Sequence, residues 1–339
     1  MNNKALTAII LAAGKGTRMK SRMAKVLHPL FFRPMVGHVI ESVLGLTPGQ
    51  VIIVVGHQHQ SVREQLRQYR VEFAEQQRQL GTGHAVLAAE DLVDDRQRDI
   101  MILCGDTPLI RPQTLSQLHR IHTECGNDLT LLTTKLEDPT NYGRIVTDFN
   151  GNISGIIEEK DATEEQRKIT EINGGIYCVR AELLFRALKN VSSDNAQGEI
   201  YLTDIVKIFV DDKLQVGRFT VVDPKDVLGV NSRRELAEAQ RELQLRRNMT
   251  LMDDGVSFIS PETTRISLES TVMADTIVEP CVHISGSSHI GHCTTIEQGS
   301  VLKNCIVGDN VFIGAGCYLE NITIDDGARI PPLTKQIIS

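Results

Sequence analysis

The carboxyl-terminal third of the chain repeats an aliphatic residue at nearly every sixth position. Hexapeptide repeats of this kind fold as a parallel β-helix, in which three hexads make one coil and the apolar rows stack inside a prism. We therefore predict a short β-helix of about three to four coils. The aliphatic positions, with two steps of five among the steps of six, are Ile266, Val272, Val278, Ile284, Ile290, Ile296, Leu302, Val307, Ile313, Leu319, Ile324 and Ile330.

Four of the seven cysteines are spaced by twelve residues within this repeat, at Cys281, Cys293, Cys305 and Cys317. Twelve residues are two hexads, whereas stacking on one face of the prism needs three. The spacing also contains no CxxC pair of the kind that zinc sites use. We therefore predict free thiols rather than a disulfide ladder or a metal site.

Residues 1 to about 228 alternate apolar strand-like runs with helical patterns. Continuous apolar runs are typical of parallel strands covered on both faces, and a βαβ alternation indicates a doubly wound sheet with its ligand crevice at the carboxyl ends of the strands. Pro34 is expected to open the first long helix. The predicted strands are Ala5–Leu11, Val51–Val55, Ile100–Cys104 and Leu129–Thr133.

A capping box at Ser232–Glu235 predicts a charged helix that runs to about Arg247 and connects the two parts of the chain. The predicted organisation is an α/β domain over residues 1–230, a linker helix over 231–250 and a β-helix over 251–339.

Length and charge limit the partners of the chain. At 339 residues, two domains are expected. The net charge of −7 and the pI near 5.8 argue against nucleic acid and against an anionic membrane surface. The first apolar run is followed by Lys15, Arg18 and Lys20 rather than by small neutral residues, so it predicts a buried strand and not a signal peptide. We expect a soluble, cytoplasmic protein.

The segment from Leu11 to Leu27, LAAGKGTRMKSRMAKVL, has the composition of a triphosphate site. Gly14 and Gly16 allow backbone N–H groups to approach an anion closely. Arg18 and Lys25 add full positive charges. Its spacing matches neither the dinucleotide fingerprint nor the P-loop.

Asp106 follows a predicted strand in the motif LCGDTPL, where a carboxylate could hold Mg²⁺ on a triphosphate. Asn231 could supply a second protein oxygen. The alternatives are a turn aspartate before Pro108 and an additional helix cap at Asn231.

Two further sets of polar residues suggest the rest of a substrate site. The motif QxxQLGTGHA presents amide side chains that could read the edge of uracil, although a solvated glutamine-rich turn is an alternative. The segments YGRI, EEKDAT and NGGIY could bind sugar hydroxyls through carboxylate and amide groups. The alternative for these segments is a set of polar surface turns.

Taken in order, the motifs LAAGKGTRM, QLGTGHA, GDTPL, DPTNYGRI, GIIEEKDAT, EINGGIY, NAQGEIYLTDI and GVNSR closely resemble one family. This is the family of bifunctional N-acetylglucosamine-1-phosphate uridylyltransferases/glucosamine-1-phosphate acetyltransferases, in its uridylyltransferase part. The resemblance covers about residues 5 to 330. It implies an α/β fold, with a Rossmann-like, doubly wound nucleotidyltransferase domain followed by a short left-handed parallel β-helix.

The resemblance also implies roles for single residues. Arg18 and Lys25 would stabilise the phosphates during catalysis, and Asp106 with Asn231 would bind Mg²⁺. The nucleotide would contact Leu11, Ala12, Ala13, Gly14, Gln76, Gln79, Gly81 and Thr82, with the glutamines and Gly81 at uracil. The sugar would contact Gly143, Glu158 and Asn173, with Thr82 beside them. The chain departs from the family pattern at Ala24 (usually proline), Cys104 (often tyrosine) and Gly174 (usually threonine).

The predicted reaction joins UTP and N-acetylglucosamine 1-phosphate and releases pyrophosphate. Alternatives are another sugar 1-phosphate, such as glucose 1-phosphate with UTP or dTTP, and a catalytically silent regulatory subunit. The chain stops at Ser339 without the further coils that carry acetyl transfer in the family, so we expect no acetyltransferase activity and expect His283, His289 and His292 to be surface residues. By analogy with the family, the β-helix is expected to form a homotrimer.

Overall fold

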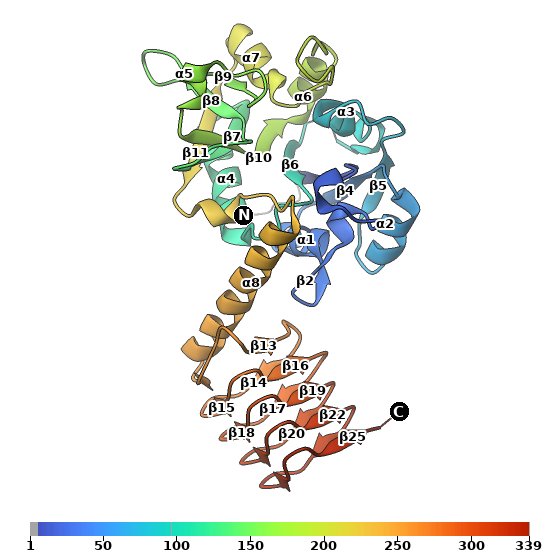
Figure 1. Cartoon of the computed structure of the whole chain (residues 1–339). Coiled ribbons are helices and arrows are strands. Elements are labelled where there is room, and N and C mark those ends of the chain that lie inside the picture. Colours follow the sequence, from blue (N-terminus) through green and yellow to red (C-terminus); the bar gives the residue numbers. More distant parts are fainter. Residues whose placement is uncertain (1–5, 96, 339) are drawn as a thin grey trace. The chain divides into compact units, whose positions relative to one another are not determined.

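The structure is a computed structural model that describes residues 6–95 and 97–338. The chain divides into two compact units (Figure 1). One contains the described residues up to His28 together with Pro34–Arg233. The other contains Pro29–Arg33 and the described residues from Arg234 onward.

The first unit is built on a nine-stranded mixed sheet. Its main path runs β11-β7-β10-β6-β1-β4-β5, and β8 and β9 form an antiparallel extension next to β10. The strands are β1 (Leu6–Ala12), β4 (Gln50–Val55), β5 (Glu72–Glu75), β6 (Asp99–Cys104), β7 (Leu129–Lys135), β8 (Arg144–Thr147), β9 (Ile153–Ile157), β10 (Glu171–Arg180) and β11 (Val216–Val221).

Helices cover both faces of this sheet (Figure 1). Along β1, Ala8 and Ile10 pack into one apolar cluster and Ile9 into the other, because successive side chains of a strand point to opposite faces. The first cluster includes residues of α1 (Met35–Leu44), α2 (His59–Leu66) and α4 (Pro112–Glu124). The second includes residues of α3 (Thr82–Leu87), α6 (Ala181–Leu188) and α7 (Asp204–Asp211).

The remaining short elements connect these layers. They are the helix α5 (Glu164–Arg167), the 3-10 turns η2 (Thr17–Met19), η3 (Lys25–Leu27), η4 (Glu90–Leu92) and η5 (Pro224–Asp226), and the short strands β2 (Pro29–Leu30) and β3 (Arg33–Pro34).

The four strands predicted from apolar runs are present within one or two residues of the predicted bounds, although Ala5, predicted to start the first, lies outside the described residues. β1, β4 and β6 are parallel, as predicted, and β5, which was not predicted, is parallel to β4. The expectation of parallel neighbours fails at β10, which is antiparallel to both β6 and β7. Its segment mixes glycines with apolar residues and gives no directional signal in the sequence.

The second unit contains the β-helix, whose strands form three parallel stacks (Figure 1). The first stack is β12 (Ser257–Phe258), β15 (Ile277–Val278), β18 (Thr295–Ile296), β21 (Phe312–Ile313) and β24 (Arg329–Ile330). The second is β13 (Arg265–Ile266), β16 (His283–Ser285), β19 (Val301–Lys303), β22 (Tyr318–Glu320) and β25 (Lys335–Ile337). The third is β14 (Thr271–Val272), β17 (His289–Ile290), β20 (Ile306–Val307) and β23 (Thr323–Ile324).

The aliphatic row predicted from the hexad spacing forms the core of this prism. Ile266 lies beside Ile284 and Ile284 beside Leu302, a step of three hexads, and all three are fully buried. Stacks of five, five and four strands amount to more coils than the three to four predicted. The prediction missed β12, whose core residue is the aromatic Phe258, and β25, whose side chains are exposed.

All seven cysteines are described and are free thiols, as predicted. In the β-helix Cys305 and Cys317 are buried, whereas Cys281 and Cys293 are exposed. Of the three histidines expected at the surface, His289 and His292 are exposed. His283 is half-buried, and its ring centroid lies 5.3 Å from that of Phe32.

The helix α8 (Arg233–Asp253) runs six residues beyond the predicted end at Arg247. Its extension is bonded to the first coil: Asn248 donates to the carbonyl oxygens of Pro261 and Thr264. Arg247 donates to the carbonyl oxygen of Ser270. The last turns of the helix are therefore stabilised by tertiary contacts that the capping pattern does not reveal.

None of the helices in residues 6–95 and 97–338 combines the length and apolar character needed to cross a membrane.

Candidate active site

A cavity of about 540 Å³ lies where the parallel strands of the sheet end. Ala12 ends β1, Cys104 ends β6 and Gln76 directly follows β5. All residues predicted for catalysis, nucleotide binding and metal binding line this cavity: Leu11, Ala12, Ala13, Gly14, Arg18, Lys25, Gln76, Gln79, Gly81, Thr82, Asp106 and Asn231. The predicted sugar residues Gly143, Glu158 and Asn173 are not among its lining residues.

Glycine occupies positions 14 and 16 of the first loop for different structural reasons. Gly16 has a φ of +60°, and a Cβ there would lie 2.4 Å from the Cβ of Lys25. Only glycine therefore fits beside the Lys25 side chain at this position. A Cβ on Gly14 would have no protein atom within 4 Å. The space facing Gly14 belongs to the cavity and is open to a ligand.

Three charged or polar side chains converge around Asn231. Nζ of Lys25 donates to a carboxylate oxygen of Asp106 and, at 2.6 Å, to Oδ1 of Asn231. Nη2 of Arg18 donates to the same Oδ1 at 2.8 Å. Lys25 is 9% exposed, so its ion pair with Asp106 is shielded from water and is stronger than a surface pair.

Asp106 and Asn231 together present a carboxylate oxygen and an amide oxygen to the cavity. Both are hard oxygen ligands of the kind that Mg²⁺ prefers, and Mg²⁺ usually takes few protein ligands because it retains water and binds substrate phosphates. The donor set therefore fits a magnesium ion.

Gln76 is 3% exposed and held by its own turn. Its Nε2 donates to the carbonyl oxygen of Gly81 at 3.0 Å and lies 3.1 Å from Nδ1 of His84. Within the described residues, Oε1 of Gln76 has no hydrogen-bond partner. Gly81 has a φ of +110°, and a Cβ there would lie 2.5 Å from the carbonyl oxygen of Ile200, so the turn requires glycine.

Cys104 lines the cavity beside Asp106. Burial and the negative charge of Asp106 outweigh the opposing effect of Lys25 and raise the pKa of the Cys104 thiol to about 12. The side chain is therefore a neutral thiol at physiological pH and a poor nucleophile.

The three predicted sugar residues lie together at the neighbouring strands β8 to β10. The backbone N–H of Asn173 donates to the carbonyl oxygen of Gly143 at 2.9 Å. A Cβ on Gly143 would lie 3.4 Å from Oε1 of Glu158. The amide of Asn173 donates to the Tyr177 hydroxyl at 2.6 Å and accepts from the Gly175 N–H at 3.0 Å. One donor hydrogen and one acceptor lone pair of that amide are left for a ligand.

Glu158 occupies a partly buried, acidic environment. Burial raises its pKa, and the nearby carboxylates of Asp204 and Asp161 raise it further, against the hydrogen bond from Thr203 and the charge of Arg144. The pKa of Glu158 thus lies above the ordinary range of a glutamate.

Two of the sequence motifs, KDAT and NAQGE, contact each other. The carboxylate of Asp161 accepts from the backbone N–H of Ala196 at 3.0 Å. Nζ of Lys160 donates to Oε1 of Gln197 at 2.5 Å. The same stretch of chain reaches the cavity, because Glu199 lines it.

The structure gives reasons for two departures from the family pattern. A Cβ on Gly174 would lie 2.9 Å from the carbonyl oxygen of Leu132 on the adjacent strand, so the position is closely packed. Ala24 has a φ of −54°, within the range that proline imposes, so the backbone before Lys25 keeps a proline-like conformation.

Comparisons with known proteins agree with this architecture. The family model described as nucleotidyl transferase matches residues 7–238, and the model described as GlmU-like, C-terminal hexapeptide, matches residues 258–336. Bifunctional protein GlmU of Desulfotalea psychrophila is 48% identical over 331 residues, which span 98% of this chain and 98% of the relative. The chain belongs to the GlmU family.

Other members of the GlmU family are similarly close. Bifunctional protein GlmU of Geobacter metallireducens is 49% identical over 88% of this chain and 63% of its own length. That of Geotalea uraniireducens is 44% identical over 98% of this chain and 73% of its own length. The chain is a sugar-1-phosphate nucleotidyltransferase with a carboxyl-terminal hexapeptide region.

Several residues at or beside the GlmU-family site were not predicted from the sequence. Glu199 lines the cavity, and the specificity of the NAQGE motif could have drawn attention to it. Thr203 and Tyr177, which hold Glu158 and Asn173, carry no such signal, because their contacts depend on how distant segments pack.

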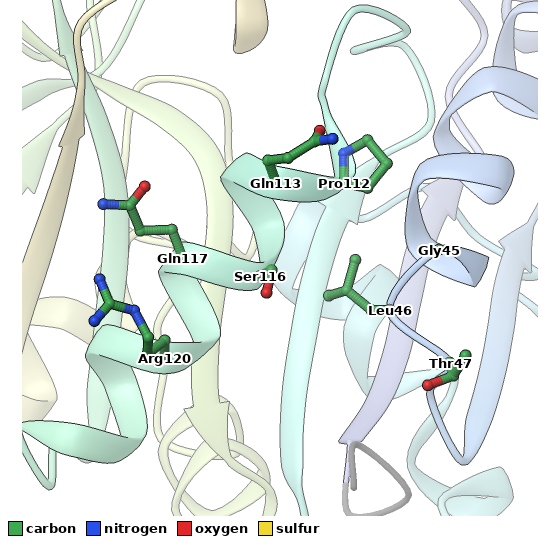
Figure 2. Close-up of a pocket in the computed structure, with 8 residues that line it drawn as sticks. All are labelled: Gly45, Leu46, Thr47, Pro112, Gln113, Ser116, Gln117 and Arg120. Atoms are coloured by element: carbon green, nitrogen blue, oxygen red, sulfur yellow. The ribbon is translucent and has the colours of Figure 1, made fainter. Parts of the chain in front are cut away.

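A second cavity, of about 630 Å³, lies between the end of α1 and the first turns of α4 (Figure 2). Its lining includes Gln113, Ser116, Gln117 and Arg120 of α4. It contains no predicted site residue, and its one cation, Arg120, is paired with Glu124 at 3.3 Å. It is therefore a polar surface groove apart from the candidate active site.

We predict that Gly14→Ala folds like the wild type but binds nucleoside triphosphate at least about tenfold more weakly, because the methyl group enters the open space of the cavity. Thermal unfolding and equilibrium dialysis measure the two effects. Gly155→Ala is the matched control, since its Cβ also has no protein atom within 4 Å. Equal nucleotide affinity of Gly14→Ala and wild type would contradict the assignment.

A second prediction compares two adjacent glutamates. The pKa of Glu158 is raised in the folded state, so ionised Glu158 destabilises the fold at pH values above that raised pKa. The destabilisation disappears as the pH falls to the ordinary pKa of a glutamate, which applies in the unfolded chain. Glu158→Gln should therefore unfold at a higher temperature than wild type at pH 7.5, with a smaller difference at pH 5.

Glu159→Gln should have the opposite effect. Glu159 pairs at 2.6 Å with Arg144, whose side chain is 2% exposed, so removing the carboxylate charge leaves a buried cation poorly compensated. We expect a loss on the order of 2–3 kcal/mol in the free energy of unfolding. If both variants were more stable than wild type, or both less stable, the environments assigned to Glu158 and Glu159 would be wrong.

Proposed function

We propose that this protein is a uridylyltransferase that converts UTP and N-acetylglucosamine 1-phosphate into UDP-N-acetylglucosamine and pyrophosphate. The observation that carries the proposal is the single cavity that brings the glycine loop, the Gln76 turn and the Lys25–Asp106–Asn231 cluster together. A silent regulatory subunit would have no need for this combination of anion-binding and metal-binding groups.

In the proposed reaction, an oxygen of the sugar 1-phosphate attacks the α-phosphorus of UTP in line. The new P–O bond forms as the bond from the α-phosphorus to the bridging oxygen breaks, and pyrophosphate leaves with that electron pair. Arg18 and Lys25 would stabilise the charge that develops on the phosphate oxygens. The chain's contribution is placement and charge neutralisation.

Asp106 and Asn231 would hold the Mg²⁺ ion. When bound, the ion neutralises phosphate charge and orients the triphosphate. Lys25 now donates to both of these residues and Arg18 donates to Asn231, so a rearrangement of both cations toward phosphate oxygens is part of the proposal.

Gln76 supports selection of the base. Because its Nε2 is engaged by its own turn, Oε1 is the atom left for the base, and a carbonyl oxygen accepts only from a donor. We place ring atom N3 opposite Oε1: uracil and thymine carry an N–H there, whereas cytosine carries a lone pair and has its donor at the 4-amino group instead. The pyrimidine is therefore expected to be uracil or thymine.

Glu158, Asn173 and Gly143 would contact the sugar. A carboxylate and an amide can pair with adjacent hydroxyl groups, and Gly143 leaves room beside Glu158. The preference for N-acetylglucosamine over glucose comes from the family resemblance and from the relatives' name, bifunctional protein GlmU.

We also propose that the β-helix mediates a homotrimer. Support comes from the hexapeptide region and from isoleucines that point outward from its strands, Ile277 at 41% and Ile306 at 55% exposure.

Pyrophosphate release with UTP, dTTP and CTP, each offered with N-acetylglucosamine 1-phosphate or glucose 1-phosphate, tests the proposal. We expect the highest kcat/KM for UTP with N-acetylglucosamine 1-phosphate. With CTP, kcat/KM should be lower by about 10³-fold or more, because Oε1 of Gln76 would face a lone pair. Asp106→Asn should lower kcat by about 100-fold or more.

The alternatives give different results in the same assay. Preference for glucose 1-phosphate or dTTP would replace the substrate assignment and retain the reaction. Absence of turnover with every pair would refute the enzyme, and full activity of Asp106→Asn would refute the metal site.

A further inference from the structure

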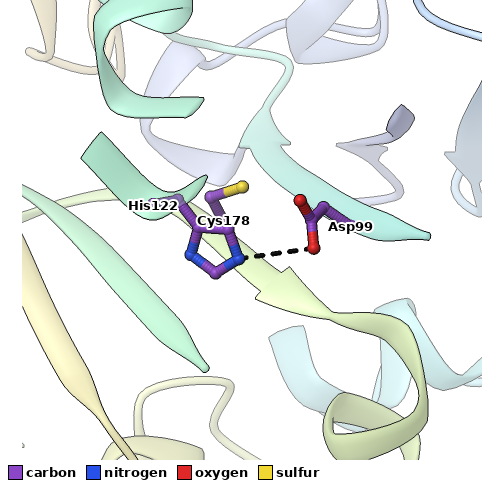
Figure 3. A group of neighbouring side chains, drawn as sticks. All are labelled: Asp99, His122 and Cys178. Atoms are coloured by element: carbon purple, nitrogen blue, oxygen red, sulfur yellow. Dashed lines mark ion pairs between the residues drawn. The ribbon is translucent and has the colours of Figure 1, made fainter. Parts of the chain in front are cut away.

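A group of titratable side chains lies on the α4 face of the central sheet, apart from the candidate active site. Asp99 begins β6, Cys178 lies on β10 and His122 lies on α4 (Figure 3). Their potential ligand atoms all lie within 4.8 Å of one another. His122 is 2% exposed and Cys178 is fully buried, whereas Asp99 is half-buried.

The sheet places Asp99 and Cys178 on one face. In the antiparallel pairing of β6 and β10, Cys178 lies opposite Met101 and Arg180 opposite Asp99. Asp99 and Met101 are two residues apart and so share a face, which makes Asp99 the diagonal neighbour of Cys178. Cys178 and Met101 belong to the apolar cluster that α4 covers, so His122 of α4 lies on the same face of the sheet as these two residues.

One nitrogen of His122 is already held by a neighbouring hydroxyl. Nδ1 lies 2.9 Å from Oγ1 of Thr130, which also accepts from Asn127 at 3.0 Å. Nε2 is buried and has no hydrogen-bond partner in the described part of the chain, although it lies 3.4 Å from Oδ1 of Asp99. In the tautomer in which Nδ1–H of His122 donates to Thr130, Nε2 keeps a lone pair, which is the arrangement typical of metal-ligating histidines.

We propose that Asp99, His122 and Cys178 bind a zinc ion. Imidazole, thiolate and carboxylate are the three ligand types that Zn²⁺ uses, and a mixed set containing sulfur disfavours Mg²⁺ and Ca²⁺. Around a tetrahedral zinc ion with bonds of 2.0–2.3 Å, ligand atoms lie about 3.3–3.8 Å apart. The 3.4 Å between Nε2 of His122 and Oδ1 of Asp99 already has this value, and the sulfur of Cys178 lies within 4.8 Å of both.

His119 lies beside the other oxygen of the Asp99 carboxylate. It lies on α4 one turn before His122, and its Nε2 is 3.3 Å from Oδ2 of Asp99.

A bound ion would tie α4 to β6 and β10. β6 leads directly to Asp106, and β10 carries Asn173. The alternative is an ion pair between Asp99 and the histidines with Cys178 packed as a small apolar residue, and zinc binding distinguishes the two. This proposal is independent of the proposed uridylyl transfer.

The test uses the full-length protein, freed of metal with a chelator and kept in excess Mg²⁺ to saturate the active site. After incubation with Zn²⁺ and gel filtration, we expect one zinc per wild-type chain. Cys178→Ala should bind zinc at least tenfold more weakly. Zinc should also raise the unfolding temperature of wild type and leave that of Cys178→Ala unchanged.

Cobalt substitution identifies the sulfur ligand, because a thiolate bound to Co²⁺ gives a near-ultraviolet charge-transfer band. The band should be present in wild type, in Cys104→Ser and in the buried-cysteine control Cys305→Ala, and absent in Cys178→Ala. Asp99→Asn, at the exposed edge of the group, provides a second variant with weakened binding should Cys178→Ala fail to fold. A wild type without stoichiometric zinc, a band that survives Cys178→Ala, or one lost in Cys104→Ser would overturn the proposal.

Discussion

The ion pair between Lys25 and Asp106, shared with Asn231, is the interaction on which the candidate active site depends. It joins three segments that are far apart in sequence: the loop after β1, the loop after β6 and the residues before α8. Gly16 makes it possible, because any side chain there would collide with Lys25. The pair is largely shielded from water, so the electrostatic attraction between its charges is only weakly screened. A triphosphate that enters the cavity therefore meets cations that the fold already holds in place.

This arrangement favours charge neutralisation over covalent catalysis. The thiol of Cys104 lies beside Asp106, but burial and that carboxylate raise its pKa to about 12 and keep it neutral. The ammonium group of Lys25 has no lone pair while it donates to Asp106 and Asn231. The nucleophile in the proposed reaction is therefore the sugar phosphate itself, and the chain supplies positions and charges.

Features with a periodic or local cause could be predicted from the sequence. The hexad row from Ile266 to Ile330 determines the β-helix because each aliphatic residue stacks on the one three hexads away. Asp106 could be placed at the same crevice as the glycine loop in advance, because parallel strands end at one edge of the sheet. Three other features could not be predicted, because each depends on how distant segments pack and no sequence pattern links those segments. They are the antiparallel direction of β10, the hydrogen bond from Thr203 to Glu158 and the Asp99–His122–Cys178 group.

The stereochemical course at the α-phosphorus tests the central claim most directly. The substrate is UTP in which one non-bridging α-phosphate oxygen is replaced by sulfur, as a single diastereomer, and the configuration of the sugar nucleotide product is determined by phosphorus NMR. A single in-line displacement, guided by positioned charges, predicts inversion of configuration. Retention would show two successive displacements through a uridylylated residue, and would contradict the account.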